Sequence, residues 1–289
     1  MSSPLLLTLP SGRTLCYRIL GAASSPPIFF LHGNLNSRLF APSWGGTADD
    51  VAAASAKVIF VDRPGVGGSS PHPARSYLSF SEDLQSLAAH LELPEFSVVG
   101  YSSGGPHALA CSRLPGCRSV GLVSADAQYS DMGGDLMQRM FGRPAAEEID
   151  EVYLQGRSEH SAAEMKAGYE SMKKQDRAEL ALEDLAAATA QGYAGPASDG
   201  LLESRPWGFP LASPVPLRIW HGGADDDVPV EAGRYLAKHC LGLDVAGPSE
   251  EPHVAAGGKY FEVETENHTL IRRRWKAILD ETLAAAAAP

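Results

Sequence analysis

Four short apolar runs constrain the fold of this chain more than any other feature of its sequence. Each run is four or five residues long, and together they cover residues 27–31, 58–61, 96–99 and 120–123. Uninterrupted apolar runs of this length are typical of strands that are buried on both faces, as in a parallel sheet. The runs alternate with helical stretches, and this alternation predicts a doubly wound α/β sheet.

Local signals near the start of the chain extend this pattern. Two apolar stretches within residues 5–18 flank the turn sequence Pro-Ser-Gly-Arg, which predicts a β-hairpin. Farther along, residues 81–93 carry apolar side chains at helical spacing. Ser81 and Glu82 stand at the start of this stretch as a helix cap would, so we expect the helix to begin there.

The regular alternation stops between residues 128 and 214. This segment is helical and charged, contains five methionines and has no convincing strand, whereas strand-like runs return at 217–220 and 260–263. A helical block inserted into an α/β sheet is typical of a lid over the carboxyl edge, where such folds bind ligands. We therefore expect a core of residues 1–127 and 215–289, with residues 128–214 as a helical cap insertion. The alternative is a peripheral helical excursion with no role in the site.

Composition and charge exclude several classes of protein. Of the 289 residues, 44% are hydrophobic and 20% charged, a balance typical of globular domains. The formal net charge is −11, and an acidic surface repels the nucleic-acid backbone, so no nucleic-acid partner is expected. No run approaches the roughly 20 apolar residues of a membrane span, and no signal-peptide pattern is present. The four cysteines lack CxxC spacing, so we expect free thiols and a cytoplasmic location. The oligomeric state is left open.

The strongest chemical signal is the pattern Gly-x-Ser-x-Gly, formed by Gly100, Ser102 and Gly104. The pattern alone is weak, because composition by itself produces it roughly 0.3 times in a chain of this length. Its position is specific, since an apolar run ends at residue 99 and an Ala- and Leu-rich helical stretch follows the serine. On a sharp strand-to-helix turn, small glycines relieve crowding around a strained nucleophile, and the helix N-terminus supplies N–H groups. We therefore predict Ser102 as the nucleophile.

A serine nucleophile needs an acid that orients its histidine base. The predicted acid is Asp225, which follows the strand-like run 217–220 in the sequence His-Gly-Gly-Ala-Asp. Its neighbours Asp226 and Asp227 are expected to be solvated loop carboxylates. Asp126, just past the run that ends at residue 123, is the alternative acid.

His268 is the predicted general base, a task that suits histidine near neutral pH. It follows the last strand-like run and completes the order Ser102, Asp225, His268, which is typical of serine nucleophiles on this kind of sheet. The other histidines are expected to pack, as His107 does in a helix, or to brace His-Gly turns. The turn residues are His32 and His221, and the histidines expected to be solvated are His72, His90, His160, His239 and His253.

Acyl transfer also needs donors for the developing oxyanion. One predicted donor is the backbone N–H of Ser103, directly after the nucleophile. The other is the backbone N–H of Asn34, in the loop His-Gly-Asn that follows the run 27–31. A plain glycine turn is the alternative interpretation of this loop.

Together these stretches resemble the α/β-hydrolase family, in the branch with a helical cap after the sixth strand. The matching stretches follow the family's order over nearly the whole chain, at residues 32–34, 62–69, 100–105, 221–229 and 267–268. The resemblance implies an α/β-hydrolase fold: a mostly parallel, eight-stranded sheet with helices on both faces and an inserted helical cap. It also implies a structural role for residues 62–69 and a mechanism without a cofactor or metal.

Departures from the family's patterns narrow the reaction. The nucleophile is serine, whereas haloalkane dehalogenases and epoxide hydrolases of this fold use aspartate. No His-Gly-Gly-Gly run is present, so the chain does not resemble hormone-sensitive-lipase-type esterases. Residues 205–209 are similar to uncharacterised hydrolases of this branch, which implies a cap hinge and an aromatic pocket wall. The candidate substrate-binding side chains are Tyr101, Trp207 and Phe209, with core packing as the alternative for the last two.

The predicted function is carboxylesterase-like: hydrolysis of a small-molecule carboxylic ester or thioester through an acyl-enzyme on Ser102. Two other classes use the same triad, namely a lyase or cofactor-free perhydrolase-type enzyme and a ligand receptor with slow hydrolysis. The acyl-chain preference depends on how residues 128–214 fold over the site, which the sequence does not determine.

Overall fold

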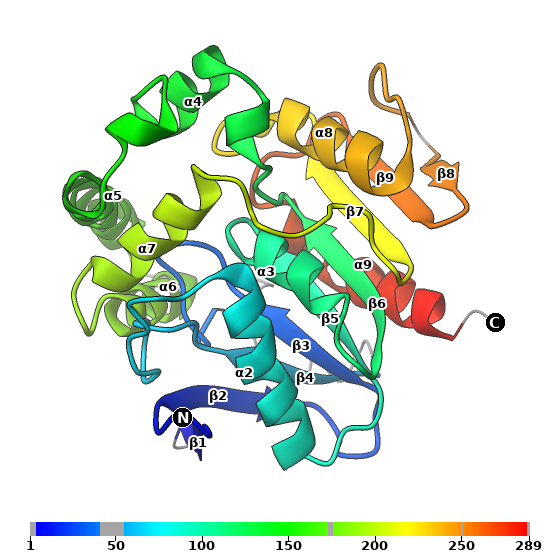
Figure 1. Cartoon of the computed structure of the whole chain (residues 1–289), viewed down its shortest axis with the longest axis horizontal. Helices are drawn as coiled ribbons and strands as arrows, with labels where there is room; N and C mark the ends of the chain where they lie inside the picture. The colour runs from blue at the N-terminus through cyan, green and yellow to red at the C-terminus, as the bar shows by residue number, and fades with distance from the viewer. Residues whose placement is uncertain (1–3, 41–54, 173–175, 250, 288–289) are drawn as a thin grey trace.

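The computed structural model of the chain describes residues 4–40, 55–172, 176–249 and 251–287, and its centre is a twisted β-sheet (Figure 1). Within these residues the sheet has nine strands in the order β1-β2-β4-β3-β5-β6-β7-β9-β8. Neighbours from β4 to β9 in this order pair in parallel, whereas the edge pairs are antiparallel. The strands are β1 (Leu5–Thr8), β2 (Thr14–Leu20), β3 (Pro27–Leu31), β4 (Lys57–Val61), β5 (Phe96–Tyr101), β6 (Cys117–Val123), β7 (Leu217–Gly222), β8 (His253–Ala255) and β9 (Gly258–Val263).

Helices cover both faces of the sheet. On one face lie α2 (Tyr77–His90), α3 (Gly104–Cys111) and α8 (Val230–Leu241). On the other face, α9 (Leu270–Ala286) packs across the central strands β5, β6 and β7. The arrangement is the expected α/β-hydrolase fold, with a mostly parallel sheet between two layers of helices.

All the expected apolar runs form strands of this sheet, and the expected hairpin is β1–β2. Along β3, alternate side chains enter different cores. Phe29 and Leu31 pack in the core on the side of α2 and α3, whereas Ile28 and Phe30 pack in the core on the side of α9. Both faces of β3 are therefore buried, which explains why its sequence shows no polar alternation.

The short edge strand β8 was not expected. The eight expected strands correspond to β1–β7 and β9, and β8 pairs antiparallel with β9 at the end of the sheet. It is three residues long and its central residue, Val254, is 65% exposed. Its side chains are half-buried or exposed, so no pattern of buried side chains marks the strand in the sequence.

Helix α2 begins at Tyr77, earlier than expected, and the prediction that Ser81 caps it is wrong. The N-cap is Ser76, whose backbone is extended (φ −138°, ψ 173°) and whose side chain accepts a hydrogen bond from the Ser79 N–H. The Ser79 hydroxyl accepts one in return from the Ser76 N–H at 2.8 Å. This capping box satisfies two N–H groups at the helix start. Ser81 is buried inside the helix and donates to the Leu78 carbonyl.

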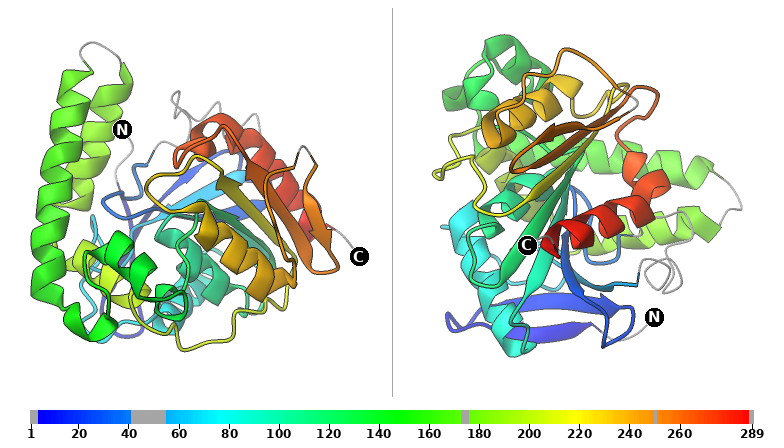
Figure 2. Two further views of the ribbon diagram at one scale, coloured as in Figure 1. Left: turned by 90° about the horizontal axis from the view of Figure 1, so that it is seen from above. Right: turned by 90° about the vertical axis from the view of Figure 1, so that its right-hand side faces the viewer.

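The segment between β6 and β7 contains helices and, in its described residues, no strand. It consists of η1 (Tyr129–Asp131), α4 (Gly134–Phe141), η2 (Ala146–Glu148), α5 (Glu151–Ser171), α6 (Asp176–Ala188) and α7 (Ala194–Glu203). Figure 2 shows α5 and α6 side by side, as a pair of helices standing next to the sheet. The insertion expected at residues 128–214 is thus helical.

Buried charges join α7 to the loop after β4. Asp199 of α7 accepts hydrogen bonds from the Arg63 guanidinium, at 2.7 Å to Nη2, and forms a second ion pair with Arg75. All three side chains are almost inaccessible to solvent. Burial opposes ionisation of Asp199, but the two guanidiniums outweigh it and lower the pKa of the carboxyl. Removing one partner from such a buried cluster leaves an uncompensated charge, so the contact holds α7 firmly on the core.

All four cysteines are free, as expected: Cys16, Cys111, Cys117 and Cys240. The first three are buried, and burial raises the pKa of Cys16 and Cys117 to about 12. Their thiols are therefore protonated and unreactive at neutral pH. Among the helices of the described residues, none is both long and apolar enough to span a membrane.

Candidate active site

The predicted nucleophile Ser102 lies on the sharp turn between β5 and α3. Its φ is +52°, in the left-handed region that residues other than glycine seldom adopt. The Ser102 N–H donates to the Val123 carbonyl of β6 at 3.0 Å, and the Ser102 carbonyl accepts from the Gly105 N–H at 2.8 Å. These bonds hold the strained residue between the sheet and the start of the helix, as a nucleophile elbow requires.

The glycines around Ser102 are required by close backbone contacts. A Cβ at Gly100 would overlap the Gly104 carbonyl, and a Cβ at Gly104 would overlap the Leu31 carbonyl of β3. Gly33, in the loop after β3, lies so close that a Cβ there would be 3.1 Å from Cβ of Ser102. The spacing of glycines in the motif therefore follows from how tightly β3, β5 and α3 meet.

Asp225 and His268 lie in hydrogen-bond contact although 43 residues separate them. Nδ1 of His268 is 2.9 Å from Oδ2 of Asp225. The other carboxylate oxygen of Asp225 accepts hydrogen bonds from the backbone N–H groups of Val228, at 2.8 Å, and Asp227, at 3.0 Å. The Asp225 side chain is fully buried and fixed by the loop after β7, so it can orient the imidazole ring.

The charges of this pair support each other. Burial of the His268 ring disfavours its charged form, but the hydrogen bond and negative charge of Asp225 outweigh burial and raise the pKa of His268. Burial likewise opposes ionisation of Asp225, but the hydrogen bond and charge of His268 lower the pKa of that carboxyl. A carboxylate that stabilises an imidazolium is the arrangement a histidine base needs when it takes up a proton.

The backbone of His268 is held against the residues that flank Ser102. Its carbonyl accepts a hydrogen bond from the Ser124 hydroxyl at 3.2 Å and another from the Tyr101 hydroxyl at 3.4 Å. The Tyr101 and His268 rings are also in contact, with centroids 5.1 Å apart. The structure therefore brings His268 and Asp225 to the turn that carries Ser102. Sequence reasoning had assigned no part to Ser124, whose left-handed φ of +43° offered no sequence signal.

The two predicted oxyanion donors are the backbone N–H groups of Asn34 and Ser103. Within the described residues, neither the Asn34 nor the Ser103 N–H donates to a protein acceptor. The N–H groups of the next loop residues are occupied, since Leu35 donates to the Asn34 side chain and Asn36 to the Gly33 carbonyl. Donors without a protein partner beside a nucleophile are available to a substrate oxygen.

Hydrogen bonds from Arg63 hold the loop that carries Asn34. Arg63 donates from its backbone N–H to Nε2 of His32 at 3.3 Å and from its guanidinium to the carbonyls of His32 and Gly33. Asp62, next to it, accepts from the Arg38 N–H at 2.6 Å and the Gly68 N–H at 2.9 Å. Asp62, Arg63 and His32 thus have structural partners in these loops, which agrees with the structural role expected for residues 62–69 and for His32.

Asp126, the alternative acid, has a different partner. It accepts a hydrogen bond from the Tyr129 hydroxyl at 2.7 Å, while its backbone N–H donates to the Ser102 carbonyl at 3.4 Å. Burial raises its pKa to about 6, and hydrogen bonding to Tyr129 limits the rise. Burial and the nearby Asp126 charge together raise the pKa of Glu203, whose Oε1 has no partner in the described residues. Asp126 thus belongs to a buried acidic pair beneath the turn.

His90, His160 and His239 are exposed as expected, but the expectation that His72 and His253 are solvated is wrong, because both are half-buried and His253 bonds to the Gly247 carbonyl. The other histidines and acids lie where the sequence predicted them. His107 is buried between Tyr77 and Phe80, and His221 bonds to the Val228 carbonyl within its own turn at 2.9 Å. Asp226 and Asp227 are exposed.

The three aromatic candidates for substrate binding are packed side chains. Tyr101 is 5% exposed and stacks on Phe40 at 5.2 Å. Trp207 is 4% exposed and packs against Tyr77 and Phe209 in the core on the α2 side. These contacts account for all three without a substrate, and a role in substrate binding stays a prediction.

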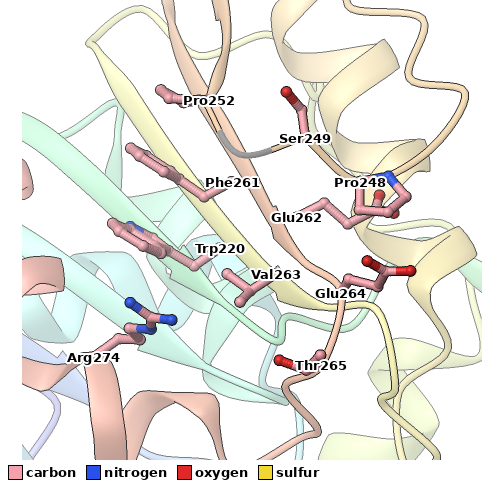
Figure 3. Close-up of a pocket in the computed structure, with 10 residues that line it drawn as sticks. All are labelled: Trp220, Pro248, Ser249, Pro252, Phe261, Glu262, Val263, Glu264, Thr265 and Arg274. Carbon is pink, nitrogen blue, oxygen red and sulfur yellow. The ribbon is translucent and has the colours of Figure 1, made fainter.

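A separate cavity of about 680 Å³ lies over β7 and β9 (Figure 3). Trp220 and Phe261 stack face to face on one side of it, with centroids 3.8 Å apart, and Arg274 lies beside them. None of Ser102, Asp225 and His268 lines this cavity. Among the described residues, no group of three or more His, Cys, Asp and Glu side chains is placed to hold a metal ion.

Comparison with known families decides the classification. A family model described as the alpha/beta hydrolase family matches residues 28–277. The chain belongs to the alpha/beta hydrolase family. The matched region of this alpha/beta hydrolase includes Ser102, Asp225 and His268, together with all of residues 128–214.

Two curated proteins are similar to parts of this alpha/beta hydrolase. The proline iminopeptidase of Arabidopsis thaliana is 29% identical over 120 residues, which are 38% of this chain and 29% of that protein. The sn-1-specific diacylglycerol lipase ABHD11 of Mus musculus is 36% identical over 96 residues, which are 33% of this chain and 31% of that protein. The alignments span less than a third of the length of these relatives.

Solved structures share the fold over the full length. The esterase RhEst1 from Rhodococcus sp. ECU1013 covers 99% of this alpha/beta hydrolase and 99% of its own chain, with a TM-score of 0.65 and 17% sequence identity. At this identity the likeness concerns the fold.

Sequence reasoning missed the side chains that support the site of this alpha/beta hydrolase from a distance. The missed residues are Asp199 of α7, which bonds to Arg63 across 136 residues, and Asp184 of α6, which bonds to Ser37 across 147 residues. No local pattern distinguishes these residues from solvated charges, because their burial follows only from the packing of the insertion on the sheet.

Proposed function

We propose that the protein is a serine hydrolase that cleaves a small-molecule carboxylic ester or thioester. The observation that carries this proposal is the 2.9 Å contact between His268 and Asp225 beside the left-handed turn at Ser102. The names of the similar proteins support it, because a peptidase, a lipase and an esterase all transfer acyl groups.

The residues would act in two acyl-transfer steps. His268 takes the proton from the Ser102 hydroxyl while Oγ attacks the carbonyl carbon, and the N–H groups of Asn34 and Ser103 stabilise the oxyanion. The imidazolium then protonates the leaving alkoxide or thiolate, which leaves an acyl-serine. Water, deprotonated by His268, attacks this ester, and the imidazolium returns the proton to Oγ of Ser102 as the acid is released. Throughout, Asp225 holds the ring in the tautomer whose Nε2 accepts a proton.

We also propose that residues 128–214 act as a cap over the site. Support comes from their contacts with the loop that carries Asn34 and with the loop that follows β4. The Asn34 side chain donates to the Pro196 carbonyl of α7 at 3.4 Å, and Gln191 donates to the Gly67 carbonyl at 2.8 Å. An insertion that contacts the oxyanion loop is in a position to shape the acyl pocket.

The activity should depend on pH through His268. The base must be neutral to accept a proton, and the pKa of His268 is raised above 6.5. We therefore expect kcat/KM to rise with pH through one ionisation above 6.5, and to be lost as the pH falls below it. In Asp225→Asn the charge that raises this pKa is gone, so the acid limb of the remaining activity should move to lower pH. A flat profile down to pH 5 would contradict the assignment of His268.

A series of p-nitrophenyl esters from acetate to palmitate tests the function itself. We expect multiple turnovers with one carboxylic acid released per p-nitrophenolate. The preferred acyl-chain length will indicate the size of the acyl pocket. Release of a single equivalent of p-nitrophenolate without further turnover would indicate a receptor. Formation of an aldehyde or ketone without consumption of water would indicate a lyase. Either result would replace the hydrolase proposal.

A further inference from the structure

The loop that carries the proposed oxyanion donor Asn34 is bonded to a single carboxylate of the insertion. Asp184 of α6 accepts three hydrogen bonds from it. Its Oδ1 accepts from the Ser37 N–H at 2.9 Å and from the Ser37 hydroxyl at 2.6 Å, and its Oδ2 accepts from the Asn36 side-chain amide at 3.0 Å. Both carboxylate oxygens of Asp184 therefore accept hydrogen bonds from Asn36 and Ser37, two and three residues after Asn34.

Apolar packing reinforces these hydrogen bonds. Leu35 adopts a left-handed backbone (φ +54°) and is buried in a small cluster with Ala162 of α5 and Leu185 of α6. Leu185 directly follows Asp184, so one turn of α6 contributes both a polar and an apolar contact to the loop. With the bond from Asn34 to Pro196, each loop residue from 34 to 37 contacts the insertion.

The position of Asp184 is costly for a carboxylate. The residue is 3% exposed, and no Lys, Arg or His of the described residues forms an ion pair with it. Burial raises its pKa to about 7, while the hydrogen bonds from Ser37 and Asn36 and the more distant charge of Arg18 oppose the rise. A buried acid without a cation is unfavourable for stability, so its three bonds to a catalytic loop point to a positional role.

We infer that Asp184 is a positioning residue, which holds residues 34–37 so that the Asn34 N–H points at the oxyanion of the acyl-transfer step. The inference rests on the proposed function for its catalytic part. Asp184 does not touch the substrate. It fixes the loop through Ser37 and Asn36, and so makes the geometry of the oxyanion hole depend on the docking of α6.

The expected consequence lies in kcat. An oxyanion donor acts on charge that develops in the transition state, and a displacement of about 1 Å can cost roughly 10²-fold in rate. Ground-state binding of an ester does not use the donor to the same extent. Loss of the Asp184 bonds should therefore lower kcat about 10- to 100-fold and change KM by less than about threefold.

The test compares Asp184→Asn with Glu183→Gln. The first variant preserves shape but presents an amide donor to the Asn36 amide, whereas the second removes a charge from the exposed neighbour on the same helix. Two readouts are taken: kcat and KM on the best p-nitrophenyl ester, and hydrogen exchange of a peptide that covers residues 33–40. In Asp184→Asn we expect the kcat loss given above and at least tenfold faster exchange of the Ser37 amide. In Glu183→Gln we expect the kinetic constants and the exchange rate of the Ser37 amide to equal those of the wild type.

The loop side provides a second route if Asp184→Asn does not fold. Ser37→Ala removes one of the three hydrogen bonds and Asn36→Ala another, and each should lower kcat while KM stays nearly constant. Because all act through the same contact, Asp184→Asn combined with Ser37→Ala should lose less than the sum of the single effects in free energy.

The outcomes separate this inference from the proposed function. If the wild type hydrolyses no ester, the proposed function fails, and loop exchange alone then decides whether Asp184 holds the loop. Unchanged exchange in a folded Asp184→Asn variant would overturn the inference whether or not the protein is a hydrolase. Faster exchange with unchanged kcat, or a change confined to KM, would overturn the positioning role.

Discussion

Replacement of Ser102 by alanine is expected to lower kcat for the best ester about 10⁵-fold or more. Ser102 supplies the oxygen that becomes acylated, and its neighbour Ser103, the other serine of the turn between β5 and α3, does not share its left-handed backbone (φ −52°). The oxyanion donors are backbone groups and remain in the variant, so a small residual rate above that of water should persist. Steady-state kinetics on p-nitrophenyl esters measure the loss.

Covalent labelling provides the companion measurement. A fluorophosphonate should modify the wild type once, on the peptide that contains Ser102, and should not modify Ser102→Ala. Ser11→Ala, in the exposed turn between β1 and β2, serves as the matched control and should label and turn over as the wild type does. Full activity in Ser102→Ala, or labelling of a different serine, would rule out the proposed nucleophile.

The second large effect is expected at the acid. Asp225→Asn should lower kcat about 10³- to 10⁴-fold. The Asn oxygen can still accept from the Val228 and Asp227 N–H groups, so the loop should keep its shape. The Asn nitrogen, however, faces Nδ1 of His268 and donates to it, which leaves the proton on Nε2. In that tautomer the ring cannot accept the proton of Ser102.

Asp126→Asn tests whether Asp126, rather than Asp225, is the acid that orients His268. Asp126 bonds to Tyr129, and an asparagine oxygen can accept the same bond, so we expect kcat within about tenfold of the wild type. The same steady-state measurements compare the two variants, and circular dichroism checks that both are folded. A loss in Asp126→Asn larger than in Asp225→Asn would transfer the acid role to Asp126.

Much of the fold followed from local sequence. The apolar runs predicted β3 to β7 because strands buried on both faces need an apolar side chain at nearly every position, whereas β9, whose burial alternates, was predicted from its run of β-forming residues. The start of α2 did not follow in the same way. Serines stand at positions 76, 79 and 81, and each of them is able to cap a helix. Only the structure distinguishes them, because Ser76 has the extended backbone of an N-cap residue.

The elbow at Ser102 was predicted from the sequence, and the structure shows why its glycines are required. The spacing of the glycines follows from close backbone contacts between β5, α3 and β3. Because these contacts involve the motif itself, they appear as a local sequence pattern. The choice of Asp225 over its neighbours had a weaker local basis. In the structure it is the buried member of the three adjacent aspartates and the one in contact with His268.

By itself, then, the sequence determined the succession of every strand except β8, the turn that carries Ser102 and the family to which the chain belongs. Only the tertiary structure decided which charges support the site. Asp184, Asp199 and Arg63 are ordinary helix or loop residues in the sequence, and they become buried only when the insertion packs against loops more than a hundred residues away. Burial by distant segments changes the environment of a charge without changing its neighbours along the chain, so no local pattern records it.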